Sequence, residues 1–450
     1  MIKRLAGRVM SLSATIHSDE IGPTLKLALR IFLILFAYYL LKPVREAFIL
    51  TDGSAELRSY SVALQALVLF IVIPLYSMLY KRVTGEKLYN RITFFFVVTL
   101  CGFWLAGVNG LAISVPFFIW LGIFSVTQVA QFWALVTDLH QPKSGKRLFA
   151  IIGFGGSLGA VLGSSFASEL FAFFGPYTLL LLAAVILLLS SFALRIKPRD
   201  SARVTRSTTA IDWHAMLGGL HLVLKLPYLR ILAIFVVLLN CVNSLGEYIL
   251  ASMVVDHFSD ITSSDERGIL IGEFYSDFFF WVNLTSLLLQ FFIVSRIYRL
   301  IGVSGAIILL PLITTIGYAL IAFFPIFAVV RIVKIIENST DYSITATTRH
   351  ALFLPVCTDS KYLGKTTIDT FFWRLGDLIQ AGVVFMGTVL LKLDLGTFAV
   401  INIMLSLLWL WVGIKIGRYY KHYTQQSELT GTVDMISPIV LAKNRNSADP

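Results

Sequence analysis

Long apolar runs recur along almost the whole chain, and they constrain its fold more than any other feature of the sequence. A helix needs roughly 20 mainly apolar residues to cross a hydrocarbon core about 30 Å thick. Twelve such runs are present, at about 25–50, 60–80, 92–111, 114–137, 148–173, 176–195, 229–255, 273–295, 302–324, 325–349, 363–391 and 394–416. The sequence therefore predicts an all-α membrane protein with twelve transmembrane helices.

The composition excludes most other classes of protein. Of the 450 residues, 57% are hydrophobic and 14% are charged, whereas a soluble domain carries about 25% charged residues. The 35 Phe residues also argue against disorder, which needs low hydrophobicity. Cys101, Cys241 and Cys357 show no paired spacing, so we expect neither a disulfide framework nor a zinc site, and no cofactor.

Basic residues are concentrated in alternate connections between the apolar runs. If the N-terminus is cytoplasmic, most of the 37 Lys and Arg residues fall on the cytoplasmic side, and the opposite side holds only Arg58, Arg267 and Lys392. This is the asymmetry that the positive-inside rule predicts for an even number of spans. The net charge of +11 therefore indicates orientation in the lipid bilayer, and nucleic acid is not an expected partner.

The N-terminal segment carries no signal-peptide pattern. Residues 1–18 are basic and contain no acidic residue. We interpret them as a basic cytoplasmic tail, with an organelle transit peptide as the alternative, because such peptides are also basic and poor in acids. We expect a monomer in a bacterial inner membrane with both termini in the cytoplasm.

The order of the runs predicts two six-helix halves of the major facilitator kind. The expected segments are a tail (1–24), an N-terminal half (25–195), a central cytoplasmic loop (196–228), a C-terminal half (229–418) and a second tail (419–450). Weak internal similarity supports the duplication, since SGKRLF (144–149) and LGKTTI (363–368) occupy equivalent connections. The central segment IDWHAMLGGLHLVL (211–224) predicts an amphipathic helix on the cytoplasmic membrane surface.

Charged residues inside the first span are the first candidates for a functional site. A charge at the bilayer centre costs about 2.5–3.5 kcal/mol, so it normally faces a cavity or a partner. Lys42, Arg45 and Glu46 lie three and four residues apart and share one helix face. The alternative is that the span ends at Leu41 and leaves these charges at the outer interface.

Polar residues also follow one face of the seventh and tenth spans. Asn240, Asn243 and Glu247 are spaced by three and four residues. The tenth span carries a polar stripe: Arg331, Lys334, Asn338, Asp341, Thr345 and Thr348, flanked by Glu337 and Arg349. Such a face lines a cavity or, alternatively, forms a structural salt-bridge seam from Lys334 to Glu337 or Asp341. The eleventh span adds Asp369, Arg374, Asp377 and Gln380.

The segment GFGGSLG (153–159) matches a dinucleotide-binding pattern, but it lies inside an apolar span. Gly155, Gly159 and Gly163 are spaced by four residues. That spacing is typical of close helix packing in membranes, so we expect no nucleotide-binding loop there.

Several segments together resemble the nucleotide (ATP/ADP) transporter family of bacteria and plastids. They are YYLLKPVREAFIL (38–50), the pair Gly246–Glu247, the connection FWALVTDLHQPKSGKRLFAIIG (132–153) and DYSITATTRHALFLPVCTDSKYLGKTTIDTFFWRLGD (341–377). In the last segment the matching positions are Tyr342, Ser343, Pro355, Lys361, Gly364, Lys365, Asp369, Arg374 and Gly376. The resemblance implies the major facilitator fold and exchange of ATP for ADP.

Three departures from the family pattern bear on the substrate. His350 follows Arg349 where the family has an acidic residue, Asp377 stands where it has Lys, and the first-span motif is altered.

The charges within the membrane are balanced: Lys42, Arg45, Arg331, Lys334 and Arg374 against Glu46, Glu247, Glu337, Asp341 and Asp377. A nucleotide site should carry a surplus of cations to bind phosphates. The alternatives for the substrate are therefore ATP/ADP and another organic anion.

The leading hypothesis is a secondary transporter that works by alternating access around a central site. The expected substrate-binding residues are Lys42, Arg45, Arg331, Lys334 and Asn243. The expected charge partners or proton-coupling acids are Glu46, Glu247, Asp341 and Asp377. The expected gating or family-motif residues are Tyr342, Lys361, Lys365, Asp369 and Arg374. No catalytic or metal-ligating set is expected.

Two alternatives stay open. The first is a proton-coupled symporter or exporter of a small organic solute, for which protons are a further partner. The second is a membrane enzyme or lipid-handling protein, which would need a catalytic constellation at one interface, and the sequence shows none.

Overall fold

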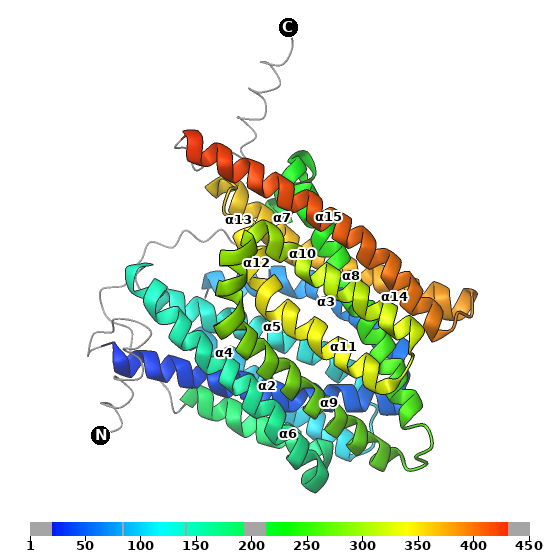
Figure 1. Cartoon of the computed structure of the whole chain (residues 1–450). Coiled ribbons are helices and arrows are strands. Elements are labelled where there is room, and N and C mark those ends of the chain that lie inside the picture. Colours follow the sequence, from blue (N-terminus) through cyan, green and yellow to red (C-terminus); the bar gives the residue numbers. More distant parts are fainter. Residues whose placement is uncertain (1–19, 83–84, 140–141, 193–212, 431–450) are drawn as a thin grey trace. The chain divides into compact units, whose positions relative to one another are not determined.

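The computed structural model describes residues 20–82, 85–139, 142–192 and 213–430, and every regular element in these ranges is helical (Figure 1). The expected N-terminal tail up to residue 19, the first part of the central loop and the C-terminal tail after Thr430 lie outside the described residues.

The earlier helices are α2 (Ile21–Asp52), α3 (Ala55–Arg82), α4 (Glu86–Val108), α5 (Ser114–Leu139), α6 (Pro142–Phe192) and α7 (Trp213–Lys225). The later ones are α8 (Pro227–His257), α9 (Ser264–Leu288), α10 (Val294–Phe323), α11 (Phe327–Thr340), α12 (Ala346–Ala351), α13 (Thr358–Thr367), α14 (Trp373–Phe385) and α15 (Leu395–Thr430). Four π-helical segments continue some of them: η1 (Leu289–Ile293), η2 (Asp341–Thr345), η3 (Ile368–Phe372) and η4 (Met386–Leu390).

The helices account for the predicted membrane spans. Eight helical stretches in the described residues are long and apolar enough to cross a membrane. Two of them, Leu148–Ser191 and Ser264–Phe323, are interrupted at Gly175 and Gly302, where φ is 67° and 66° and a side chain would be strained. Each therefore supplies two spans. The stretches 327–351 and 358–390, which π-helices divide into shorter pieces, complete the predicted twelve.

Helix α2 continues through the charges near its middle. It includes Pro43 and ends only at Asp52, and Ile49 and Leu50 are buried. The helix therefore continues past Leu41, because the apolar residues after the charges extend its buried face, and the depth of these charges in the bilayer stays a prediction.

The described residues group into two compact units that do not coincide with the two halves of the sequence. The first unit contains residues 1–53, 75–210 and 258–283, and the second contains 54–74, 211–257 and 284–450. The beginning of α3 thus belongs with later helices, and most of α9 belongs with earlier ones. The six-helix halves stay a prediction from the sequence.

In the first unit, α2 packs closely along α6. A Cβ atom added at Gly155, Gly159 or Gly163 would lie only 2.4, 2.3 or 2.6 Å from a backbone carbonyl oxygen of α2. The predicted role of these glycines in close helix packing is confirmed.

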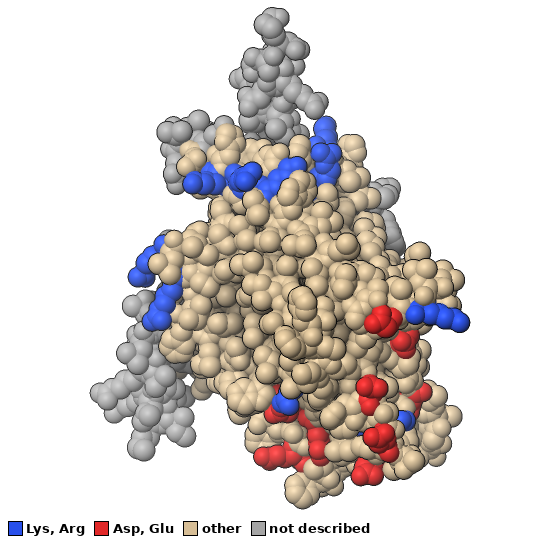
Figure 2. All heavy atoms as spheres, turned by 45° about the vertical axis from the view of Figure 1, so that its right-hand side comes forward, with Lys and Arg blue, Asp and Glu red and all other residues tan. Residues whose placement is uncertain are grey.

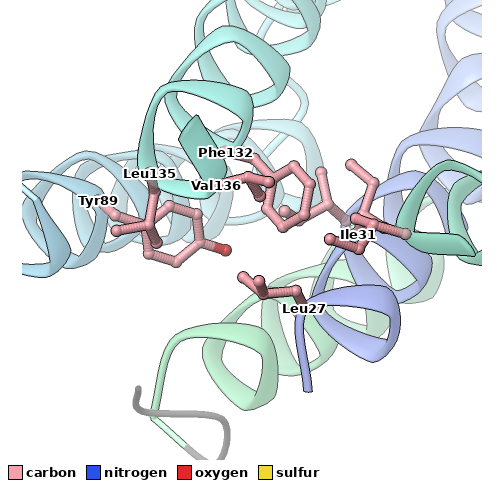
Figure 3. Close-up of a cluster of buried hydrophobic side chains, with 8 residues drawn as sticks. Leu27, Ile31, Tyr89, Phe132, Leu135 and Val136 are labelled. Carbon is pink, nitrogen blue, oxygen red and sulfur yellow. The ribbon is translucent and has the colours of Figure 1, made fainter. Parts of the chain in front are cut away.

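In the same unit, α2, α4 and α5 contribute side chains to one apolar cluster (Figure 3): Leu27, Ile31, Tyr89, Phe132, Leu135 and Val136.

In the second unit, α8 packs against α11, α14 and α15, and α7 packs against α13. The helix predicted over 211–224 is thus present as α7. At the contact with α13, a Cβ atom on Gly219 would lie 2.0 Å from the Thr367 hydroxyl, so the glycine allows the two helices to approach.

On the face that Figure 2 shows, broad areas carry no charged side chain. Large apolar side chains are exposed on many helices, among them Phe95 on α4, Phe173 on α6 and Met404 on α15. Broad exposed apolar surfaces of this kind are expected where helices contact lipid. The chain is a multi-pass, all-α membrane protein.

Candidate functional site

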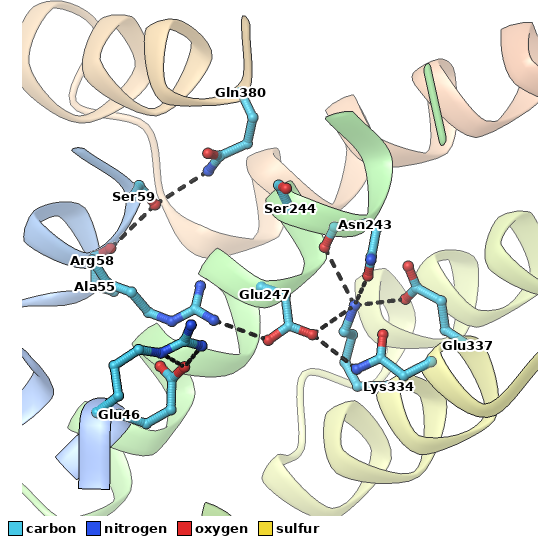
Figure 4. Close-up of polar contacts among 12 residues, drawn as sticks. Glu46, Ala55, Arg58, Ser59, Asn243, Ser244, Glu247, Lys334, Glu337 and Gln380 are labelled. Atoms are coloured by element: carbon cyan, nitrogen blue, oxygen red, sulfur yellow. Dashed lines mark hydrogen bonds and ion pairs between the residues drawn. The ribbon is translucent and has the colours of Figure 1, made fainter. Parts of the chain in front are cut away.

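Glu247 on α8 lies at the centre of a polar network in the second unit (Figure 4). Its Oε2 accepts a hydrogen bond of 3.2 Å from Nη2 of Arg58 on α3. Its Oε1 accepts one of 2.9 Å from Nδ2 of Asn338 and lies 3.4 Å from Nζ of Lys334, both on α11. One carboxylate therefore joins three helices.

The Lys334 ammonium group has all of its hydrogen-bonding capacity engaged by the protein. Besides Glu247, its Nζ lies 3.0 Å from Oδ1 and 3.3 Å from the carbonyl oxygen of Asn243, and 3.1 Å from Oε2 of Glu337. An ammonium group has three protons to donate, and Lys334 is fully buried. A substrate group reaches Lys334 only if one of these acceptors leaves.

Charges within this network cancel. Arg58 and Lys334 carry two positive charges, and Glu247 and Glu337 carry two negative charges. Burial of a charge is tolerated when a partner of opposite sign compensates it. The second carboxylate, Glu337, also accepts a 2.6 Å hydrogen bond from the Tyr318 hydroxyl.

Gly246 makes room for this network. A Cβ atom at that position would lie 1.7 Å from the Tyr318 hydroxyl and 3.0 Å from Nζ of Lys334. Position 246 therefore requires glycine for steric reasons, because any side chain there would displace Tyr318, whose hydroxyl binds Glu337.

A second polar cluster in the same unit joins α8 to α14. Oδ1 of Asp377 accepts hydrogen bonds from Asn240 (2.7 Å) and Ser244 (3.3 Å). Its Oδ2 lies 3.1 Å from Nη1 of Arg374. Gly376 allows this close approach, because a Cβ atom there would lie 2.8 Å from the backbone oxygen of residue 237 on α8.

The first turns of α3 contact both α8 and α14. The Tyr248 hydroxyl donates to Oε1 of Glu56 at 3.0 Å. Nε2 of Gln380 donates to the Ser59 hydroxyl at 3.2 Å. Together with the bond from Arg58 to Glu247, these contacts hold the beginning of α3 against two helices from the second half of the sequence.

The charged residues of α2 lie among aromatic rings in the first unit. Nζ of Lys42 is 3.9 Å from the ring centroid of Phe279, and the Arg45 guanidinium is 4.4 Å from that of Phe118. Arg45 also forms an ion pair with Glu46, whose side chain is fully buried. Cations over aromatic faces gain electrostatic stabilisation that grows as water is removed.

The remaining predicted site residues lie elsewhere in the second unit. Arg331 is half-buried on α11, Tyr342 is exposed on η2, and Lys361 and Lys365 are half-buried on α13. Asp341 is buried on η2 and, among the described residues, forms no ion pair with Lys334. Oδ1 of Asp369 lies 4.0 Å from Nε of Arg349.

The span predicted from residue 60 leaves Arg58 in a connection, whereas the structure includes Arg58 in a helix. Arg58 lies in the first turn of α3, its exposed fraction is 6%, and it binds Glu247. The helix begins earlier than its apolar run because the Ser54 hydroxyl caps it and accepts the Leu57 N–H at 3.3 Å. Serine before an acidic first turn was the available signal.

Two further buried groups were missed by the sequence reasoning. Tyr318 lies in an apolar run with no charged residue near it in the sequence. Arg30 on α2 is fully buried and pairs with Glu86 on α4 at 2.7 Å. Their partners lie on other helices, so neither residue has a local signature.

Comparisons with known proteins support the fold. No family model matches the chain, and no curated protein matches its sequence. A crystal structure described as the nucleoside transporter NupG is similar with a TM-score of 0.63 at 14% identity, over 88% of this chain and 99% of that one. A crystal structure of a bacterial homolog of the human lysosomal transporter Spinster is similar with a TM-score of 0.59 at 13% identity, over 89% of this chain and 97% of that one.

A third structure, the human organic anion transporter MFSD10, is similar with a TM-score of 0.55 at 18% identity, over 87% of this chain and 98% of that one. At these identities the likeness concerns the fold. The chain has a major facilitator-like fold, as the order of its apolar runs predicts.

Proposed function

We propose that the chain is a secondary transporter that works by alternating access and couples solute movement to protons through Glu247. The observation that carries the proposal is the bridging position of this carboxylate, between Arg58 on α3 and Lys334 and Asn338 on α11. Glu247 is half-buried, and a carboxylate that joins three helices can link its protonation to the separation of those helices.

The coupling follows from the balance of charges. Ionised Glu247 holds both cations, because an ion pair in a low-dielectric interior is strong and its separation is costly. A proton on Glu247 removes the negative charge and weakens both bonds. The beginning of α3 is then free to leave α8, and loss of the proton closes the contact again.

Substrate binding acts on the same network. An anionic group of the solute reaches Lys334 by replacing one of its carboxylate partners, and Asn243 would orient the incoming group. Within the first unit, Lys42 and Arg45 on α2, with Glu46 as charge partner, stay predicted substrate-binding residues. Arg331, which is half-buried on α11, would attract the anion as it approaches.

The neutral network favours a small organic solute with few negative charges. A nucleotide with three or four charges requires a surplus of cations, and the network around Glu247 has none. Exchange of ATP for ADP is the second candidate, and the segment 341–377 that resembles nucleotide transporters supports it. In that case Tyr342, Asp369 and Arg374 would belong to the family's gating motif.

Uptake by cells that express the chain separates the two candidates. Labelled small organic acids and labelled ATP are offered with and without an uncoupler. Proton-coupled transport predicts accumulation of an organic solute that the uncoupler abolishes. ATP uptake that survives the uncoupler and is chased out by ADP would establish exchange instead. No uptake above empty-vector cells for any solute contradicts both.

A further inference from the structure

An unbalanced positive charge lies on one face of α13 and η3. This face lines a cavity of about 480 Å³, formed by Lys361, Tyr362, Lys365, Thr366, Asp369 and Thr370. The residues recur at intervals of four, so they follow each other along a single side of the helix. Two ammonium groups and two threonine hydroxyls therefore lie beside the same space.

The charges of this face do not cancel, in contrast to the network around Glu247. Asp369 has Arg349 as its partner, with 4.0 Å between Oδ1 and Nε. Among the described residues, Lys361 donates only a long hydrogen bond of 3.4 Å to the Leu354 carbonyl oxygen. Lys365 forms no hydrogen bond or ion pair with the part of the chain that the structure describes. Three cations thus face one carboxylate.

We propose that the cavity beside α13 binds a phosphate group, with Lys361 and Lys365 as its cationic ligands and Thr366 as a hydroxyl donor. Two lysines four residues apart can each donate a charge-assisted hydrogen bond to different oxygens of one tetrahedral anion. This site lies apart from the Glu247 network, and its occupancy does not require that the chain transports phosphate.

The surroundings point to the head group of an acidic phospholipid as the first source of this phosphate. Tyr362 and Leu354 are 68% and 60% exposed beside the lysines. An aromatic ring next to basic residues is typical of the membrane–water interface. Basic residues at the cytoplasmic interface bind acidic lipids through their charge. A soluble phosphate is the second source of the same chemistry.

Thermal unfolding of the purified full chain tests the site without a transport assay. Inorganic phosphate is titrated against chloride at equal ionic strength, and phosphatidylglycerol nanodiscs are compared with phosphatidylcholine nanodiscs. The proposal predicts a saturable rise in the unfolding midpoint with at least one phosphate source. A rise only with phosphatidylglycerol identifies the lipid head group, and a rise only with inorganic phosphate identifies the soluble source.

Variants then assign the effect to the cavity. Lys361→Gln/Lys365→Gln should lose the rise, and Lys365→Gln alone should weaken phosphate binding about ten- to a hundredfold, as expected for one charged hydrogen bond. Lys392→Gln, at an exposed position outside this face, should leave binding unchanged. If no phosphate source shifts the wild-type midpoint, or if Lys365→Gln keeps the full shift, the site does not exist.

Discussion

Glu247→Gln removes the charge on which the proposed site depends while keeping the shape of the side chain. Arg58 and Lys334 are almost completely buried, with side-chain exposures of 7% and 0%. Removing one partner of a buried ion pair costs about 3–5 kcal/mol. Lys334 keeps Glu337 at 3.1 Å, and glutamine still accepts one hydrogen bond. We therefore expect a loss near the lower limit, about 3 kcal/mol in free energy of unfolding.

Reversible unfolding in mixed micelles measures this loss. Glu266→Gln is the matched control, because Glu266 is exposed at the start of α9 and surface substitutions change stability by about 0.5 kcal/mol or less. Equal unfolding free energies for the two variants would show that Glu247 does not stabilise the helices around it.

A double-mutant cycle isolates the bond between Glu247 and Arg58. Arg58→Gln alone leaves the carboxylate without this partner, whereas the double variant removes both charges together. The combined loss should be smaller than the sum of the single losses by about 1–3 kcal/mol. Strict additivity would refute the inference that these two side chains, 189 residues apart in the chain, act as one pair.

Three further predictions concern helix contacts. Gly159→Ala should separate α2 from α6 and lower the unfolding free energy by about 1–3 kcal/mol. Gly153→Ala is the control and should cause no such loss, because the space at its Cβ position is open. Equal losses in the two variants would contradict the packing inference. Ser59→Cys/Gln380→Cys, in a background without native cysteines, should be joined by a reducible bis-maleimide linker, and this cross-link should stop transport until the linker is cleaved. Unimpaired transport in the cross-linked protein would rule out movement between these helices. Gly246→Ala should displace the tyrosine that holds Glu337 and reduce transport at least tenfold, and wild-type rates would show that this steric limit is unimportant.

The sequence predicted the features of this fold that depend on local pattern. Apolar runs of about 20 residues predict spans because the bilayer sets their length, and the spacing of Gly155, Gly159 and Gly163 predicts close packing because small residues repeat on one face. An ion pair between Lys334 and Glu337 was one of the predicted alternatives, because these residues are three apart along the helix. Each of these inferences uses neighbours within one helix.

Features that depend on other helices could not be predicted in the same way. Arg58 was assigned to a connection because hydropathy measures apolar residues and does not register a short polar start to a helix. The saturation of Lys334 by four acceptors depends on Asn243 and Glu247, which lie on a different helix. Long-range pairing is set by packing, so no pattern within a single helix contains it.

Uptake by vesicles that contain wild-type protein or Glu247→Gln, under an imposed pH gradient, tests the central claim most directly. The readout is the accumulation of a labelled organic solute inside the vesicles, with and without an uncoupler. We expect uphill accumulation by the wild type that the uncoupler abolishes, and only equilibration by Glu247→Gln. Equal uphill accumulation by both proteins would contradict a coupling role for Glu247.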